Sequence, residues 1–167
     1  LLCRSASSFI RIMGIYVENT WKPQWSWATA YTNDSQPTTF TGQGVPVSLT
    51  RSTNYTIAEN IGMDLSSYAP EFDTLYTGLY YLNVSASFSG GGADNQYTMF
   101  FSNNGIELSE CQVSFSQLGE NQRSVNLSGM YRISGDGSTR IDVKIQNDSG
   151  TDSITLENFT MSMIKLF

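Results

Sequence analysis

The chain contains no histidine. This absence removes the usual general base at neutral pH, the Ser-His catalytic triads and the commonest zinc ligand. Its two cysteines, Cys3 and Cys111, stand in separate contexts and are too few for a structural zinc site. We therefore expect a protein that is not an enzyme, with no catalytic residues, no bound metal and no cofactor.

Charge is also scarce. Charged residues make up 14% of the chain, against roughly 25% in an average soluble domain. The net charge is −6, and the nine lysines and arginines form no cluster. A phosphate backbone is bound by basic patches, so nucleic acid is excluded as a partner. No run approaches the ~20 apolar residues of a membrane helix, so no membrane partner is expected.

Carboxylates offer the remaining candidate chemistry. They lie near predicted turns or beside a predicted hairpin, at Asp136, Asp142, Asp148, Asp152, Glu107 and Glu110. Solvated turn carboxylates are the favoured interpretation over paired catalytic acids. Calcium in loops 93–95 or 147–149 is an alternative, because oxygen ligands suffice for it. Cys111 shares the parity of Val113 and Phe115, which favours a buried free thiol over a disulfide.

The main pattern in the chain is the alternation of apolar and polar residues that is typical of β-strands. In TGLYYLNVSASFSG, residues 77–90, one face of the predicted strand carries Tyr80, Leu82, Val84, Ala86 and Phe88. The other face carries Tyr81, Asn83, Ser85 and Ser87. This pattern, with a glycine at each end, predicts a long, half-buried antiparallel strand.

Similar segments recur along the chain, whereas helical apolar spacing does not. The expected strands are 15–18, 26–32, one bulged or two short strands within 38–50, 55–57, 97–102, 111–118, 125–133, 141–146 and 154–167. Residues 63–78 are expected to be a connection, and Asn104-Gly105 predicts a hairpin turn. The pattern predicts an all-β, single-domain antiparallel jelly-roll sandwich of eight to ten strands over residues 15–167, with an extended N-terminal arm over 1–14.

In the last segment, residues 154–167, the apolar residues switch from even to odd positions. Ile154 and Leu156 share one parity, whereas Phe159, Met161 and Met163 take the other. A β-bulge near Glu157-Asn158 would explain this shift. The tail, Ile164, Leu166 and Phe167, is apolar on both faces. Two interpretations stay open: one face is covered by another subunit, or the strand is deeply packed within one chain.

Four of these segments, in order, resemble the jelly rolls shared by tumour necrosis factor and the complement-type globular heads. They are YTGLYYLNVSASFSG, with Gly78 and Tyr80 opening the long strand; the turn NNGIEL; the unit SVNLSGMYRISGDGSTRIDVKIQN; and the closing strand SITLENFTMSMIKL. The resemblance covers about residues 63–167. It implies a binding or structural protein that assembles as a compact homotrimer, with aromatic and apolar strand faces along the threefold axis.

The expected trimer contacts are Tyr81, Phe159, Met161, Met163, Ile164, Leu166 and Phe167. The same fold occurs on bacteriophage virions, in capsid-decorating (cement) proteins and fibre tips. The Ser/Thr/Asn-rich composition and the absence of structural disulfides favour such a particle. We therefore expect a virion protein on the capsid surface that stabilises the phage head, with the major capsid protein as its partner. Its docking arm would use Leu1, Leu2, Phe9, Ile10 and Ile12.

The alternative function is a receptor- or glycan-binding head, on a phage fibre or in a secreted complement-like module. The aromatic segment 21–27 supports it, because the flat rings of Trp21, Trp25 and Trp27 are suited to stacking on sugars. Tryptophans of β-sandwiches more often serve as core or interface anchors, and that interpretation is favoured here.

Overall fold

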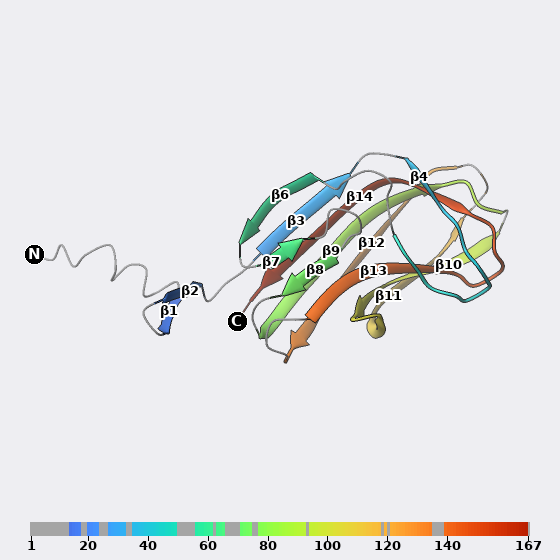
Figure 1. Cartoon of the computed structure of the whole chain (residues 1–167). Coiled ribbons are helices and arrows are strands. Elements are labelled where there is room, and N and C mark those ends of the chain that lie inside the picture. The colour runs from blue at the N-terminus through green and yellow to red at the C-terminus, as the bar shows by residue number, and fades with distance from the viewer. Residues whose placement is uncertain are drawn as a thin grey trace, which may run out of the picture.

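The computed structural model describes residues 14–17, 20–23, 27–32, 35–49, 56–61, 63–65, 71–74, 77–92, 94–117, 119, 121–134 and 139–166. Across these ranges the chain forms strands and turns but no helix, as the alternating sequence predicts (Figure 1). The described part accordingly contains no helix long and apolar enough to cross a membrane.

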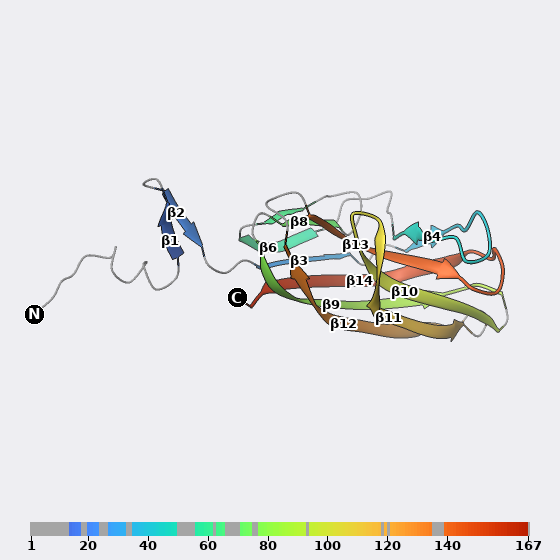
Figure 2. The same ribbon diagram turned by 90° about the horizontal axis from the view of Figure 1, so that it is seen from below.

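Two six-stranded antiparallel sheets make up the body of the molecule (Figures 1 and 2). The first sheet has the order β11-β10-β13-β8-β7, with β5 beside β13. Its strands are β5 (Val47–Ser48), β7 (Met63–Leu65), β8 (Glu71–Thr74), β10 (Asn95–Asn103), β11 (Ile106–Gln117) and β13 (Thr139–Asn147). The second sheet has the order β12-β9-β14-β3-β6, with β4 beside β14. Its strands are β3 (Trp27–Thr32), β4 (Gln36–Thr38), β6 (Thr56–Ile61), β9 (Gly78–Ser89), β12 (Arg123–Ile133) and β14 (Ile154–Lys165).

Strand β9 is an interior strand of the second sheet and lies between β12 and β14. Its alternation is the one that the sequence predicts: Tyr80, Leu82 and Val84 are fully buried, whereas Tyr81 and Ser85 are exposed. A strand with one apolar and one polar face must bury the apolar one, so β9 fixes which side of the sheet faces the core.

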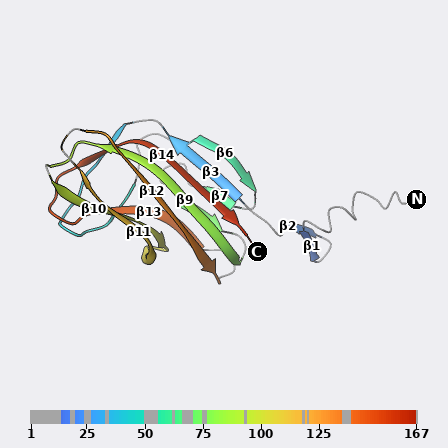
Figure 3. The same ribbon diagram turned by 180° about the vertical axis from the view of Figure 1, so that it is seen from behind.

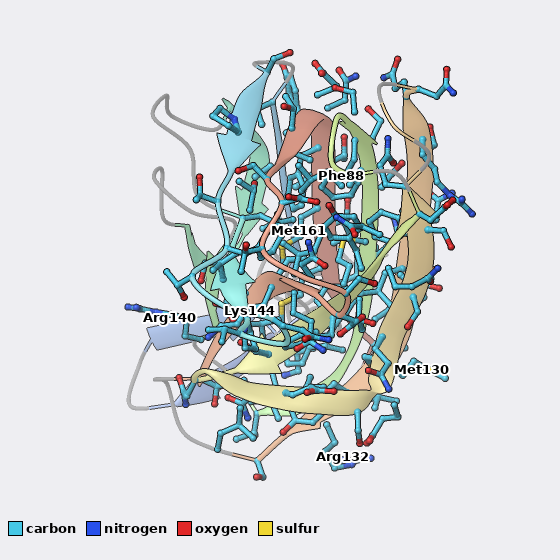
Figure 4. All side chains as sticks on the ribbon, turned by 90° about the vertical axis from the view of Figure 1, so that its right-hand side faces the viewer. Phe88, Met130, Arg132, Arg140, Lys144 and Met161 are labelled. Atoms are coloured by element: carbon cyan, nitrogen blue, oxygen red, sulfur yellow. The ribbon has the colours of Figure 1, made fainter. Side chains whose placement is uncertain are left out.

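The core fills the space between the two sheets. At one end of it Phe88 stacks on Phe115 with ring centroids 5.4 Å apart, and Phe115 stacks on Tyr97 at 5.7 Å. Phe40, which follows β4, packs against Tyr97 at 5.7 Å. Figure 4 shows Phe88 and Met161 in this interior, between the ribbons of the two sheets. Such aromatic pairs add to the stability that burial alone provides.

The C-terminal strand contains the β-bulge that its parity shift predicts. The register of β14 against β9 shifts between Leu156 and Asn158. The extra residue turns both halves of the strand the same way, so that Ile154, Leu156 and Phe159 all face the core.

This bulge corrects part of the predicted trimer interface. Phe159, Met161 and Met163 are at most 1% exposed and belong to the core of their own chain. Side chains enclosed in this way are not available to another subunit. For these three residues the alternative interpretation holds, that of a strand packed within one chain.

The structure has more strands than the eight to ten expected. The predicted connection 63–78 contains β7 and β8, which pair with each other and, through β8, with β13. Both are short and acidic, with Asp64, Glu71 and Asp73 in seven residues of strand. Strands are depleted in acidic residues, and this composition hides β7 and β8 from a pattern search.

The first two strands form a sheet of their own. Strands β1 (Gly14–Val17) and β2 (Thr20–Pro23) pair antiparallel. Figures 1 and 3 show this hairpin beyond the end of the sandwich where the C-terminus lies. The predicted arm, residues 1–12, lies outside the described residues, and the arm-to-domain boundary at residue 14 stays a prediction.

Candidate functional site

The outward face of the second sheet is the candidate functional site. Strand pairing sets Tyr81 of β9 between Met130 of β12 and Ile164 of β14. The next position across the sheet is Trp27 of β3. Beside this row the Leu166 N–H donates to the Leu79 carbonyl at 2.8 Å. An apolar row therefore crosses the sheet at the end where the C-terminus lies.

We call Leu79, Tyr81, Met130, Ile164 and Leu166 the apolar end. Four of its side chains are well exposed in the single chain, at 38% for Tyr81, 62% for Met130, 43% for Ile164 and 46% for Leu166. Isolated exposed apolar residues are ordinary on protein surfaces, but neighbouring ones in one row mark a contact surface.

The rest of this face is polar without being charged. Its outward residues on β9, β12 and β14 carry hydroxyl or amide groups: Asn83, Ser85, Ser124, Asn126, Ser128, Thr160 and Ser162. We call this region the hydroxyl-amide half. The Thr29 and Ser162 hydroxyls hydrogen-bond across the strands at 3.1 Å. Tyr31 of β3, 38% exposed, lies beside Thr160 in the register.

Among the described outward residues from 79 to 87, 124 to 132 and 158 to 166, the one charged side chain is Arg132. Figure 4 shows Arg132 and Met130 on the outside of β12, away from the core. The other sheet carries Arg140 and Lys144 on its outward positions. A face with little charge costs less to dehydrate, and depletion of charge is typical of the centre of a protein interface.

A side-chain network borders the hydroxyl-amide half at its far end. The Glu157 carboxylate, on the bulge, accepts hydrogen bonds from the hydroxyls of Ser35 and Ser89. Asn158 and Gln122 donate to the Ser87 hydroxyl at 3.0 and 3.1 Å. These bonds fix the bulge and give Glu157 a structural role.

The candidate carboxylates of the first sheet also have structural partners. Asp142 is 5% exposed and accepts hydrogen bonds from the hydroxyls of Ser102 and Ser48. Such a buried carboxylate is stable only with donors of this kind. Glu107 and Glu110 are exposed on β11, and Asp136 lies outside the described residues.

The two loops considered for calcium lie side by side. The Asp148 N–H donates to the Gln96 carbonyl at 2.8 Å, and the Gln96 N–H donates to the Ser149 hydroxyl at 3.0 Å. However, the carboxylate of Asp148 accepts from Thr98 at 2.7 Å, and that of Asp152 accepts from Asn95 at 2.8 Å. The described residues contain no group of three acidic, cysteine or histidine side chains placed to hold a metal ion.

Cys111 is a free, buried thiol, as predicted. Burial raises its pKa, and the nearby Glu110 carboxylate acts in the same direction. Its sulfur lies against Gly129 of β12, where a Cβ atom would come within 2.4 Å of Sγ. The thiol thus fills space between the edges of the two sheets and is held in its unreactive, protonated form.

The structure brings some of the predicted site residues together and separates others. Tyr81, Ile164 and Leu166 share the apolar end, whereas Phe159, Met161 and Met163 lie in the core. Trp21 falls in β2 and Trp27 in β3, so strand rather than loop carries both. Trp25, Phe167 and the arm residues Leu1, Leu2, Phe9, Ile10 and Ile12 lie outside the described residues.

Met130 and Leu79 are not among the contact residues that the sequence predicts. The missed signal is in β12, whose outward positions Ser124, Asn126 and Ser128 are polar until Met130 breaks the series. Only the register, which sets Met130 opposite Tyr81, shows that the two apolar residues adjoin.

No family model and no curated protein sequence matches this chain. Solved structures do match it. Murine APRIL at pH 5.0 superposes with a TM-score of 0.56 at 12% identity, covering 86% of this chain and 100% of that one. The globular domain of zebrafish complement 1qA gives 0.52 at 12% identity, covering 85% and 98%. APRIL at pH 8.0 gives 0.51 at 14% identity, covering 86% and 100%.

The fold is the tumour necrosis factor-like jelly roll. At 12–14% identity the likeness concerns the fold alone. It confirms the architecture that the sequence resemblance implies. The assembly and the partner rest on the residues of this chain.

Proposed function

We propose that this jelly roll is a non-enzymatic structural protein that self-associates as a homotrimer and decorates the capsid of a virus particle. The observation that carries the self-association is the outward face of β12, β9 and β14, where Tyr81, Met130, Ile164 and Leu166 are exposed in adjoining positions. Arg132 is the one charged side chain at the described outward positions of this face. This face offers apolar contact at one end and hydrogen-bonding groups along the rest.

The physical basis is burial of apolar area. Each Å² of apolar surface removed from water stabilises an assembly by ~25 cal/mol. The largely uncharged surroundings keep the desolvation cost low, and the hydroxyl-amide half can form hydrogen bonds across the contact. A closed rotation of three copies gives every copy the same contact, whereas an open arrangement would leave one copy of the face in water.

The proposed trimer and the composition support the capsid role. A trimeric clamp can straddle neighbouring capsid subunits and offset the internal pressure of a filled head. Contacts of modest strength suffice because they repeat over the lattice and act together. The low content of charged residues, 14%, suits a protein whose surfaces are covered in a larger assembly.

The test of the capsid role compares the whole chain with a variant lacking residues 1–12. We expect a gene for a major capsid protein beside the gene of this chain. We also expect shells of that protein to bind the trimer in co-sedimentation. Loss of shell binding with an intact trimer after the deletion supports docking by the N-terminal segment. Shells that do not bind the whole chain contradict the capsid role.

A receptor- or glycan-binding head is the second candidate. The observation in its favour is Tyr31, an exposed aromatic ring at the hydroxyl-amide half. Flat rings beside hydroxyl and amide groups provide both stacking and hydrogen bonds for a sugar. A glycan array probed with the wild type and with Tyr31→Ala and Trp25→Ala variants tests it. Binding that both substitutions leave unchanged, or no binding at all, counts against this candidate.

A further inference from the structure

The β1-β2 hairpin has no place in the two sheets. Within the described part of the chain its strands pair only with each other, from Gly14 opposite Pro23 to Val17 opposite Thr20. An isolated two-stranded hairpin is at best marginally stable in water. The sequence GIYV-EN-TWKP is rich in apolar residues and carries Tyr16 and Trp21 at paired positions. A hairpin of this kind gains stability by covering an apolar surface.

The hairpin is tethered next to such a surface. Three residues separate Pro23 from Trp27, the first residue of β3. A link of this length spans about 13 Å at full extension. Trp27 pairs with Ile164, and Ile164 pairs with Tyr81. The tether therefore begins at the apolar end, with neighbouring strands about 4.8 Å apart.

Within its own chain the hairpin does not lie on that face. Figures 2 and 3 show β1 and β2 projecting past the end of the sandwich. Each copy therefore presents an uncovered apolar end and, a short tether away, an apolar hairpin that points beyond its own sheet. A closed assembly of identical subunits allows these two features to meet across an interface, because every copy supplies both.

We propose that the β1-β2 hairpin of one copy packs on the apolar end of a second copy. The inference rests on the proposed self-association and adds to it a partner for the apolar end. Leu79, Tyr81, Met130, Ile164 and Leu166 of one copy would contact the hairpin of its neighbour. Assembly would then stabilise the hairpin, and the subunits would be linked by an exchanged element.

Cross-linking of the whole chain tests this contact. Two single variants, Lys22→Cys on β2 and Met130→Cys on β12, are made in a Cys3→Ser background and co-expressed; Cys111 stays, because it is buried. A short, flexible bismaleimide is expected to join one chain of each kind into a covalent pair. The matched control replaces Met130→Cys with Ile106→Cys; Ile106 is the first residue of β11 and is 72% exposed. Pairs no more abundant than with this control overturn the inference.

Two further variants separate this inference from the proposed function. Deletion of residues 1–23 is expected to raise the dissociation constant of the assembly at least tenfold, and Tyr81→Arg to raise it as much. An assembly that Tyr81→Arg disrupts but the deletion leaves unchanged overturns the hairpin contact and leaves the trimer proposal standing. An assembly indifferent to Tyr81→Arg overturns the trimer proposal itself.

Discussion

Gly129 and Cys111 show how one small residue determines the fit of two sheets. A Cβ at position 129 would lie 2.4 Å from the Cys111 sulfur, which is closer than atoms in contact allow. We expect Gly129→Ala to lower the free energy of unfolding by about 1–3 kcal/mol, the usual cost of overpacking a core. Urea denaturation measures this loss, with Gln112→Ala, an exposed position of β11 on the other sheet, as the neutral control.

The cause of that loss is tested by removing the sulfur. In a Cys111→Ala background the methyl group of Gly129→Ala has room, so its cost is expected to fall by at least 0.5 kcal/mol. An equal cost in both backgrounds would show that the glycine is needed for its backbone rather than for space.

Tyr97 makes the stability of the fold depend on alkaline pH. Burial raises its pKa, its bond with Asn95 lowers it in part, and the nearby Asp152 carboxylate raises it further. The folded chain thus keeps the phenol proton at pH values where the unfolded chain has lost it. The stability that the protonated phenol contributes is fully present below the ordinary tyrosine pKa of about 10. It is lost as the pH rises above that value.

The Tyr97→Phe variant isolates this effect. It keeps the ring contacts with Phe40 and Phe115 but removes the ionisable group. Between about pH 9 and pH 11, we expect the free energy of unfolding to fall less in the variant than in the wild type. Urea denaturation at each pH measures it. The buried Cys111 thiol titrates in both proteins and cancels. Parallel curves for the two proteins would contradict the assignment.

Strand β14 depends on a single extra residue. Glu157 occupies the bulge that lets Leu156 and Phe159 both face the core. Deleting Glu157 would turn one half of the strand over, exposing its apolar residues and burying polar ones. We expect the deletion variant to lose cooperative unfolding. Glu157→Ala, which keeps the bulge and loses the bonds from Ser35 and Ser89, is expected to cost only about 1–2 kcal/mol.

Circular dichroism during urea titration distinguishes the two changes. If the deletion variant unfolds as cooperatively as Glu157→Ala, the bulge does not set the register of β14.

The alternating strands could be predicted because a strand that buries one face has an apolar residue at every second position. The residues of β9 and the bulge of β14 were found in this way. The strands β7 and β8 could not, since they are short and acidic. The sequence also could not predict which face of β14 carries Phe159, Met161 and Met163. Apolar residues of both parities surround the bulge, and only pairing with β9 shows which parity turns inward.

The apolar end belongs to the sheet rather than to any one strand. Tyr81 and Ile164 were candidates from the sequence, but Met130 joins them only through the register of β12 on β9. Sequence patterns report burial along a strand, whereas a contact surface is assembled across strands that are far apart in the chain. The fold was therefore easier to predict than the site.

The whole molecule has two unlike outer faces. The outward face of β12, β9 and β14 is nearly free of charge, whereas the other sheet carries Arg140 and Lys144 on its outward positions. We expect association through the first face to be insensitive to salt, because apolar burial rather than ion pairing drives it. Sedimentation at low and high salt measures this. A dissociation constant that rises more than tenfold in 1 M salt would point to the charged face.

Sedimentation of the whole chain at micromolar concentration tests the central claim, self-association through the face that carries Tyr81. We expect a trimer for the wild type and for Ile106→Arg, an equally drastic change at an exposed residue on the other sheet. For Tyr81→Arg we expect a folded monomer. A wild-type chain that sediments as a stable monomer, or a Tyr81→Arg variant that remains trimeric, would contradict it.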